Sequence, residues 1–230
     1  MQGRRAVYSV PPGWYNLSGK QIRAELLFIR GGFMRRKIPV VTFIILAMNV
    51  AGLIYEYSVG ERAATYRFGM YQGALQNGEY LRAFVSAFLH FGIYHFGSNM
   101  ICLVLYGFSL ENRIGPLKYA AVYILSIAGG SLLINFAGGR GLHAGASGAI
   151  WGLMTATLVY NLRNKQNPFY ALRGIVLNLV YSFQAGVSWQ AHIGGGAAGL
   201  AAALALFCLP GGTSAGRRNS GGQYPQYPQE

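Results

Sequence analysis

The sequence predicts an all-α membrane protein, and its composition and apolar runs support this fold class. Of the 230 residues, 53% are hydrophobic and only 11% are charged. Soluble domains carry roughly 25% charged residues, so this chain is unusually poor in charge. Apolar runs that approach the ~20 residues of a membrane-spanning helix recur along most of the sequence. We therefore expect one polytopic helical domain flanked by polar segments.

The apolar runs predict six membrane helices, near residues 38–57, 83–110, 117–137, 147–162, 168–186 and 190–209. Together they form a membrane domain over 38–209. The preceding residues 1–37 are polar and basic, so we expect no secretory signal there. Within them, residues 18–30 resemble a short amphipathic helix at the inner membrane surface. The last segment, 210–230, is rich in Gly, Gln, Tyr and Pro and is expected to be disordered.

The connection over residues 58–82 is long for a link between two membrane helices. It carries Tyr66, Phe68, Tyr71 and Tyr80 among other apolar residues, which is unusual for a solvated loop. Aromatic side chains favour the membrane–water interface. We expect this loop to fold onto the outer membrane surface as a partly embedded structure.

Basic residues are distributed unevenly between the two sides of the predicted domain. With the N-terminus in the cytoplasm, fifteen Lys and Arg residues fall on the inner side. The outer side holds only four, Arg62, Arg67, Arg82 and Arg140. This is the positive-inside pattern, so topology explains the net charge of +13 and nucleic acid is not an expected partner. We expect a multi-pass plasma-membrane protein with both termini cytoplasmic.

Three polar side chains share one predicted depth in the membrane. From Ser147 to Arg163 is 16 residues, about 24 Å of helix, which is shorter than the ~30 Å hydrocarbon core. From His95 to Glu111 is also 16 residues, again about 24 Å. His192 begins a run of 18 residues, about 27 Å, that ends at a helix-breaking proline. All three helices enter from outside, so the three side chains lie nearly level.

Glycines predict that the serine and histidine helices approach each other closely. Gly148 and Gly152 form a small-residue face just below the serine, and Gly195 and Gly199 form a matching face below the histidine. A serine hydroxyl is a weak nucleophile and needs a base within hydrogen-bond reach. Polar residues inside a membrane are costly and are functional candidates by default. The pair therefore predicts a hydrolase that works inside the membrane.

His95 and Asn99 stand four residues apart, on one face of a helix. Acyl transfer develops an oxyanion that needs hydrogen-bond donors, and such side chains supply them. The free backbone N–H of Ser147 at a helix start would be a further donor. The chain contains no aspartate, and its six Glu residues lie at helix ends, in loops or in tails. We therefore expect His192 to act with the serine as a dyad.

Several short motifs resemble those of the rhomboid intramembrane proteases, and they occur in the same order. Residues 145–148 read GASG, like the family's GxSG nucleophile motif, and residues 191–199 resemble its AHxxGxxxG. Residues 95–99 resemble its HxxxN, and residues 111–115 resemble its inner turn. Residues 78–82 resemble the start of its second helix, although leucine replaces the tryptophan of the frequent Trp-Arg pair. That departure concerns anchoring of the outer loop rather than the chemistry.

The resemblance covers residues 38–209 and implies the six-transmembrane-helix rhomboid fold. It implies a serine endopeptidase that cuts membrane-anchored substrates in or near their transmembrane helices, which would approach between the second and fifth helices. By motif, Ser147 would be the nucleophile and His192 the general base, with His95, Asn99 and the Ser147 backbone as the oxyanion hole. The glycines that would pack helices at the site are Gly145, Gly148, Gly152, Gly195 and Gly199. The lipid bilayer is a further partner, no cofactor or metal is implied, and the oligomeric state stays open.

Two other functions remain possible. A catalytically silent rhomboid-like protein would only bind membrane helices, but the intact Ser-His pair argues against it. A small transporter or proton channel would need polar residues along a path to the inner side. Below the candidate site the helices become apolar, apart from residues such as Thr155, Thr157 and Asn161. As single residues, the serine could be a helix N-cap, and His95 and Asn99 could be interhelical hydrogen bonders.

The remaining candidates have simpler interpretations. His90 is expected to tie the outer loop to the second helix by hydrogen bonds, and His143 to be an exposed loop residue. Trp151 is expected to serve in core contacts or as an interface anchor. Cys102 and Cys208 fall within predicted helices and show no metal-ligand spacing.

Overall fold

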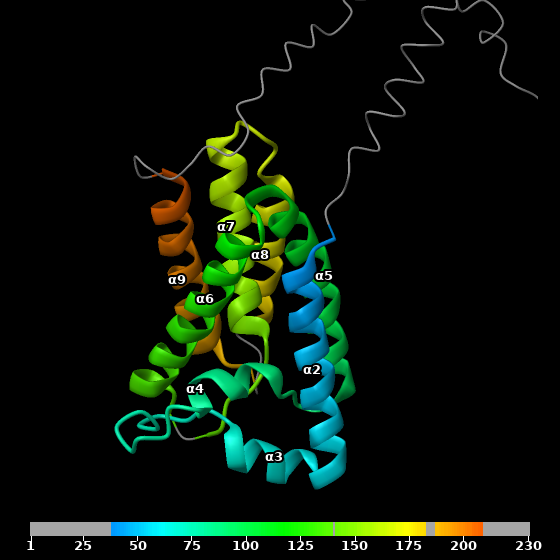
Figure 1. Cartoon of the computed structure of the whole chain (residues 1–230). Coiled ribbons are helices and arrows are strands. Elements are labelled where there is room, and N and C mark those ends of the chain that lie inside the picture. The colour runs from blue at the N-terminus through cyan, green and yellow to red at the C-terminus, as the bar shows by residue number, and fades with distance from the viewer. Residues whose placement is uncertain (1–37, 140, 183–186, 209–230) are drawn as a thin grey trace, which may run out of the picture. The chain divides into compact units, whose positions relative to one another are not determined.

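The computed structural model describes residues 38–139, 141–182 and 187–208. Its elements are α2 (Val40–Val59), α3 (Glu61–Phe68), α4 (Arg82–Val85), the 3-10 turn η2 (Ser86–Phe88), α5 (Gly92–Ile114), α6 (Pro116–Ala137), α7 (Ser147–Arg163), α8 (Phe169–Ser182) and α9 (Trp189–Cys208). Figure 1 shows the long helices side by side, with α3 and α4 lying across one end. The predicted amphipathic helix at 18–30 and the tail at 210–230 lie outside the described residues.

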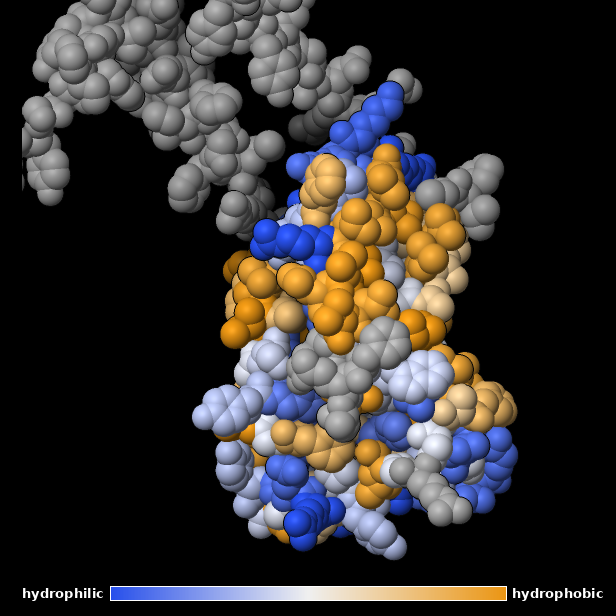
Figure 2. All heavy atoms as spheres, turned by 180° about the vertical axis from the view of Figure 1, so that it is seen from behind, coloured by the Kyte–Doolittle hydropathy of each residue, from blue (hydrophilic) through white to orange (hydrophobic). Residues whose placement is uncertain are grey.

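The expected all-α membrane fold is confirmed. Four helices, α2, α5, α6 and α9, are long and apolar enough to cross a membrane. Helix α7 has 17 residues and α8 has 14, so both are shorter. Large apolar side chains lie on the outer surface of α8, including Val176, Leu177 and Val180, which are more than half exposed. Figure 2 shows an apolar band on one face with hydrophilic residues at both ends, as lipid contact requires. The count of six crossings stays a prediction.

The predicted second helix, at 83–110, is wrong at its start. The chain forms α4 and η2, leaves helical geometry at Leu89 (φ −98°, ψ 156°), and begins α5 only at Gly92. Gly92 has φ +83°, a left-handed conformation that glycine adopts without strain. An apolar periodicity cannot show such a break, because the residues on both sides are apolar. The other five predicted helices start within two residues of the observed starts.

Helix α9 is held by direct contact of its backbone with α6 and α7. A Cβ atom placed on Gly194 would run into the backbone of Gly129 on α6. A Cβ atom on Gly195, the next residue, would run into the backbone of Gly148 on α7. Small residues allow this approach, and close van der Waals contact is what holds helices together where lipid is as apolar as leucine. The main core cluster of the domain includes the fully buried side chains of Leu103, Leu110, Tyr119, Val122 and Leu153.

Glu111 joins the C-terminal end of α5 to the start of α2. Its buried carboxylate accepts hydrogen bonds from the backbone N–H groups of Val41 and Thr42, at 2.9 and 2.8 Å, and from the Thr42 hydroxyl at 2.7 Å. The first N–H groups of a helix have no partner within the helix, and the helix dipole favours a negative charge there. One side chain thus caps a neighbouring helix and fixes where it begins.

The outer connection, residues 69–81, is tied down at several points. Arg82 donates hydrogen bonds to the carbonyl oxygens of Tyr66 and Gly69, both at 2.9 Å, and forms an ion pair with Glu79. Hydrogen bonds from Tyr71 and Arg82 hold the pKa of Glu79 below its usual value of 4.5. The loop is therefore anchored by the arginine although leucine precedes it in sequence.

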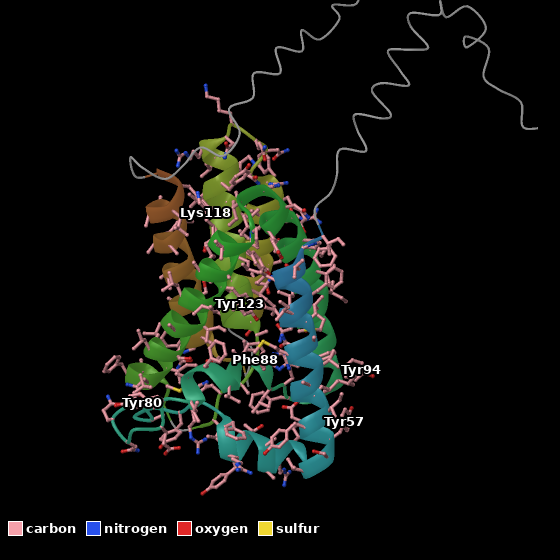
Figure 3. All side chains as sticks on the ribbon, in the orientation of Figure 1. Tyr57, Tyr80, Phe88, Tyr94, Lys118 and Tyr123 are labelled. Atoms are coloured by element: carbon pink, nitrogen blue, oxygen red, sulfur yellow. The ribbon has the colours of Figure 1, made fainter. Side chains whose placement is uncertain are left out.

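Aromatic residues mark the end of the molecule that bears this loop. Figure 3 shows Tyr57, Tyr80 and Tyr94 near that end, Lys118 near the opposite end and Tyr123 between the helices. The first three side chains are 72%, 70% and 92% exposed, whereas Tyr123 is buried. Exposed tyrosines at one level are typical of the membrane–water interface.

Candidate active site

Ser147 and His192 meet where α7 and α9 cross. Ser147 is the first residue of α7, and His192 lies one turn into α9. The chain reaches the serine through Gly145, whose φ of +134° is disfavoured for other residues. The Ser147 Oγ atom lies 2.8 Å from His192 Nε2, within hydrogen-bond distance. A buried imidazole thus faces the hydroxyl of a helix-starting serine.

The glycines predicted near the site bring these two helices together. A Cβ atom on Gly148 would lie 2.8 Å from the carbonyl oxygen of Ala191, the residue before the histidine. One turn below, a Cβ atom on Gly152 would lie 3.0 Å from the carbonyl oxygen of Gly195. A Cβ atom on Gly199 would overlap the Gly152 backbone. A larger residue at these positions would separate the serine from the histidine.

His192 has two further neighbours that the sequence analysis missed. The Trp151 ring stacks on the imidazole, with centroids 5.6 Å apart and planes inclined by 19°. The Ser182 Oγ atom lies 2.5 Å from His192 Nδ1. Trp151 follows Ser147 by four residues and so shares its helix face, a signal that was available. Ser182 lies on a different helix from both, and no spacing in the sequence connects it to them.

His95 and Asn99 approach the loop that carries the serine. A Cβ atom on Gly145 would lie 3.1 Å from His95 Nε2 and 3.7 Å from Asn99 Nδ2. Asn99 is buried, and its Nδ2 has no hydrogen-bond partner among the described residues. The Phe91 backbone N–H donates to His95 Nδ1 at 3.2 Å, so a neutral His95 carries its proton on Nε2. Two donors therefore point toward the serine loop.

A cavity of about 590 Å³ joins these groups. Its lining includes Ser147, His192, His95, Asn99 and Asn178. This volume suits a short stretch of peptide, because ligand cavities typically measure about 300–1,000 Å³. The cavity thus brings several polar side chains together within a domain whose outer surface is apolar.

His90 differs from its expected role. Its backbone N–H donates to Glu56 Oε1 at 2.6 Å, which ties this connection to α2 rather than to the second helix. The imidazole nitrogens, in contrast, have no hydrogen-bond partner in the described part of the chain. The ring packs edge-on against His95 and Phe96, each at 5.3 Å between centroids. The predicted hydrogen bonding of this side chain was therefore wrong.

His143 is half-buried rather than exposed, which also corrects the prediction. Its backbone pairs with Met70 through two hydrogen bonds of 2.7 and 2.8 Å. Its Nε2 lies 3.0 Å from the Gly138 carbonyl oxygen. Burial lowers the pKa of His143, against the opposing effect of that hydrogen bond. The bridge joins the outer loop to the segment that leads into the serine.

The described residues contain no cluster of three or more His, Cys, Asp or Glu side chains that could hold a metal ion. Cys102 is a free thiol at the cavity lining.

Comparison with known proteins gives the same family as the motifs. The sequence profile of the Rhomboid domain matches residues 77–208. The chain is 33% identical over 139 residues to RHOMBOID-like protein 1 of Arabidopsis thaliana, which covers 57% of this chain and 36% of that protein. It is 32% identical over 140 residues to Rhomboid-type serine protease 2 of Emericella nidulans, with 57% and 28% covered.

Rhomboid protease AarA of Providencia stuartii is 28% identical over 171 residues, covering 61% of this chain and 60% of that protein. The aligned regions thus span from 28% to 60% of the lengths of these three relatives. The domain match covers more than half of the chain, and it includes all four polar residues of the candidate site. The chain therefore belongs to the rhomboid family.

Proposed function

We propose that this protein is an intramembrane serine endopeptidase that works through a Ser147–His192 dyad. The observation that carries the proposal is the 2.8 Å separation of Ser147 Oγ and His192 Nε2 beside a cavity that His95 and Asn99 also line. Two of the relatives described above are named as rhomboid proteases, which supports the same chemistry. The substrates would be membrane-anchored proteins cut in or near a transmembrane helix.

In the first half of the reaction, Ser147 attacks the carbonyl carbon of the scissile peptide bond. His192 Nε2 takes the hydroxyl proton as the Oγ–C bond forms, and the carbonyl π electrons move onto oxygen. The resulting oxyanion would accept hydrogen bonds from His95 Nε2–H, Asn99 Nδ2–H and the Ser147 backbone N–H. The C–N bond then breaks, and the proton on His192 passes to the leaving amine.

In the second half, water hydrolyses the acyl-enzyme. His192 Nε2 removes a proton from water as its oxygen attacks the ester carbonyl, and the same donors stabilise the second oxyanion. The bond to Ser147 Oγ breaks, and the serine regains its proton from the histidine. A substrate helix must unwind locally to present its carbonyl, so weak helix formers near the scissile bond would favour cleavage.

The proposed route for a membrane-embedded substrate runs between α5 and α8. These helices touch where the ring centroids of Tyr106 on α5 and Tyr170 on α8 lie 5.1 Å apart. A Cβ atom on Gly174 of α8 would also run into the Tyr106 side chain. On the cavity side, Cys102 of α5 and Asn178 of α8 line the open volume. We propose entry of the substrate there, in a plasma-membrane protein with both termini cytoplasmic.

The test is labelling of the detergent-purified protein with a fluorophosphonate, followed by cleavage of a transmembrane reporter in liposomes. The wild type should label and cleave, and Ser147→Ala and His192→Ala should do neither. The remaining alternative is a silent protein that only binds membrane helices. A folded wild type that retains the reporter helix but neither labels nor cleaves it would establish that alternative.

A further inference from the structure

His192 is held at both ring nitrogens, and the second contact has no part in the reaction steps above. Its Nδ1 lies 2.5 Å from the hydroxyl oxygen of Ser182, at the end of α8. Ser182 is buried, with 2% of its surface exposed. This serine lies ten residues before the histidine, on a helix that contributes neither the nucleophile nor the base. The contact therefore links a third helix to the candidate dyad.

The Ser182 hydroxyl also has a partner of its own. Its oxygen lies 2.7 Å from the carbonyl oxygen of Asn178, one turn earlier in α8. A carbonyl can only accept, so the Ser182 hydrogen is donated to Asn178. The Ser182 oxygen then has lone pairs free for a donor. The group it faces is His192 Nδ1, which must supply that hydrogen as Nδ1–H.

This arrangement fixes which nitrogen of the neutral imidazole carries the proton. A neutral imidazole has one N–H and one lone pair, and the hydrogen bond at one nitrogen sets the state of the other. With the hydrogen on Nδ1, the lone pair of His192 lies on Nε2, toward the Ser147 hydroxyl. We propose that Ser182 is a positioning residue that holds His192 in the tautomer and ring orientation able to accept the proton of Ser147. This inference rests on the proposed function.

A neutral serine here differs in its effect from the aspartate of a Ser-His-Asp triad. Both groups can fix the tautomer and orientation, but only the carboxylate also stabilises the imidazolium by its charge. The chain contains no aspartate to do so. Removing the Ser182 hydroxyl should therefore slow the reaction by about ten- to a hundred-fold, the usual effect of one hydrogen bond to a charged group.

The experiment compares Ser182→Ala, which removes the hydroxyl, with Ser182→Thr, which keeps it. Thr157→Val is the matched control, because the buried Thr157 hydroxyl makes the same bond to a carbonyl one turn earlier, 2.7 Å to Leu153. It lies ten residues below Ser147 on α7, about 15 Å along the helix. Each variant is examined for its fluorophosphonate labelling rate against pH, for kcat and KM on the reporter, and for thermal unfolding.

We expect Ser182→Ala to lower the labelling rate and kcat by about ten- to a hundred-fold with KM unchanged, and Ser182→Thr to restore most of the rate. Nitrogen-15 NMR of histidine-labelled protein, assigned with His192→Gln, should show Nδ1 protonated in the wild type and mixed tautomers in Ser182→Ala. Thr157→Val should label at the wild-type rate.

Two results would overturn the role of Ser182. One is a Ser182→Ala rate and pH profile equal to those of Thr157→Val. The other is equal slowing in Ser182→Ala and Ser182→Thr, which would assign the effect to side-chain volume. Should Ser182→Ala unfold, the Thr variant and the wild-type NMR tautomer still decide the question. Failure of the proposed function looks different, since the wild type would then not label in a Ser147-dependent manner.

Discussion

At the scale of single residues, the Asn99 amide has an unpaired donor in a buried place. Its Nδ2 atom has no hydrogen-bond partner among the described residues, and only 6% of the residue's surface is exposed. Leaving a buried donor unpaired costs about 1–3 kcal/mol. In the proposed reaction the oxyanion is an acceptor for this donor. The amide would bind the charged oxyanion more strongly than the neutral carbonyl, which favours the transition state over the substrate.

We predict that Asn99→Ala lowers kcat by about 100- to 1,000-fold, the usual loss for one oxyanion donor. KM should change little, because the amide would bind the charged intermediate more strongly than the neutral carbonyl. The measurement is steady-state cleavage of a transmembrane reporter in liposomes. Asn112→Ala is the control, since this exposed asparagine of α5 only bonds the Phe108 carbonyl in its own helix. An Asn99→Ala defect confined to KM would contradict the role.

Residue identity explains which parts of the site could be predicted. Ser147, His192, His95 and Asn99 are polar groups in apolar helices, and their cost makes each one visible in the sequence. Trp151 and Ser182 carry no comparable cost in a membrane helix. Tryptophan is common there, and a serine hydroxyl can donate to a backbone carbonyl of its own helix, as Ser182 does to Asn178. The spacing of Trp151 from Ser147 placed both on one helix face, whereas the contact of Ser182 with His192 comes from the structure alone.

At the scale of elements, the contact between α7 and α9 rests on particular glycines. A Cβ atom on Gly195 would overlap the backbone of Gly148, which cannot move aside as a side chain could. The neighbouring Gly196 differs, since its nearest contact would be 3.4 Å from the Trp151 ring. Substituting alanine at Gly195 would therefore disturb the contact between the helices, whereas the same substitution at Gly196 would mainly change the helix propensity of α9.

We predict that Gly195→Ala destabilises the protein by about 1–3 kcal/mol through overpacking and abolishes labelling of Ser147. The labelling should fail because displaced helices break the hydrogen bond from Ser147 to the histidine. Gly196→Ala should keep labelling and leave stability equal to wild type or up to about 1 kcal/mol higher, since alanine favours a helix over glycine by that amount. Thermal unfolding and fluorophosphonate labelling in detergent measure both effects. Equal behaviour of the two variants would contradict this account of the interface.

The outer loop should respond to acid through Glu79. The hydrogen bonds from Tyr71 and Arg82 lower its folded pKa, so its contribution to loop stability is fully present above the unfolded pKa of about 4.5. That contribution is lost as pH falls through the folded pKa. We predict faster limited proteolysis within 69–81 as pH falls below about 4.5, measured with an acid-active protease. Glu79→Gln should remove this pH dependence, and a loop equally resistant at all pH values would exclude it.

Helix positions were predictable where apolar runs end at polar residues, as at Ser147 and Arg163 of α7. The break between η2 and α5 was not, because apolar residues lie on both sides of it and the change shows only in the backbone angles of Leu89 and Gly92. The break has a consequence for the site. It starts α5 three residues before His95, which places the imidazole at the outer end of the helix, near the loop that carries the serine.

At the scale of the whole molecule, the distribution of basic residues predicts which end faces the cytoplasm. The end that holds the start of α6 and the junction of α7 with α8 carries Lys118, Arg163 and Lys165. The opposite end carries Arg62, Arg67 and Arg82, and Arg82 is engaged with Glu79 within the outer loop. Eight further basic residues precede α2 in sequence, including three in a row at 35–37. The excess of basic residues therefore comes mainly from the segment before the membrane domain. It predicts that this segment lies in the cytoplasm.

We predict that the end of the molecule with the loop over residues 69–81 faces outward. The test introduces single cysteines into a variant in which Cys102 and Cys208 are replaced by alanine. Tyr66→Cys lies on α3, where the native side chain is 77% exposed, and Gln166→Cys lies in the exposed turn after α7. A membrane-impermeant maleimide should label Tyr66→Cys in intact cells, and Gln166→Cys only after permeabilisation. This topology would open the serine cavity toward the outer face, so substrates would be cut near the outer end of their helices. Labelling of Gln166→Cys in intact cells would reverse the topology and move the expected cleavage to the cytoplasmic end.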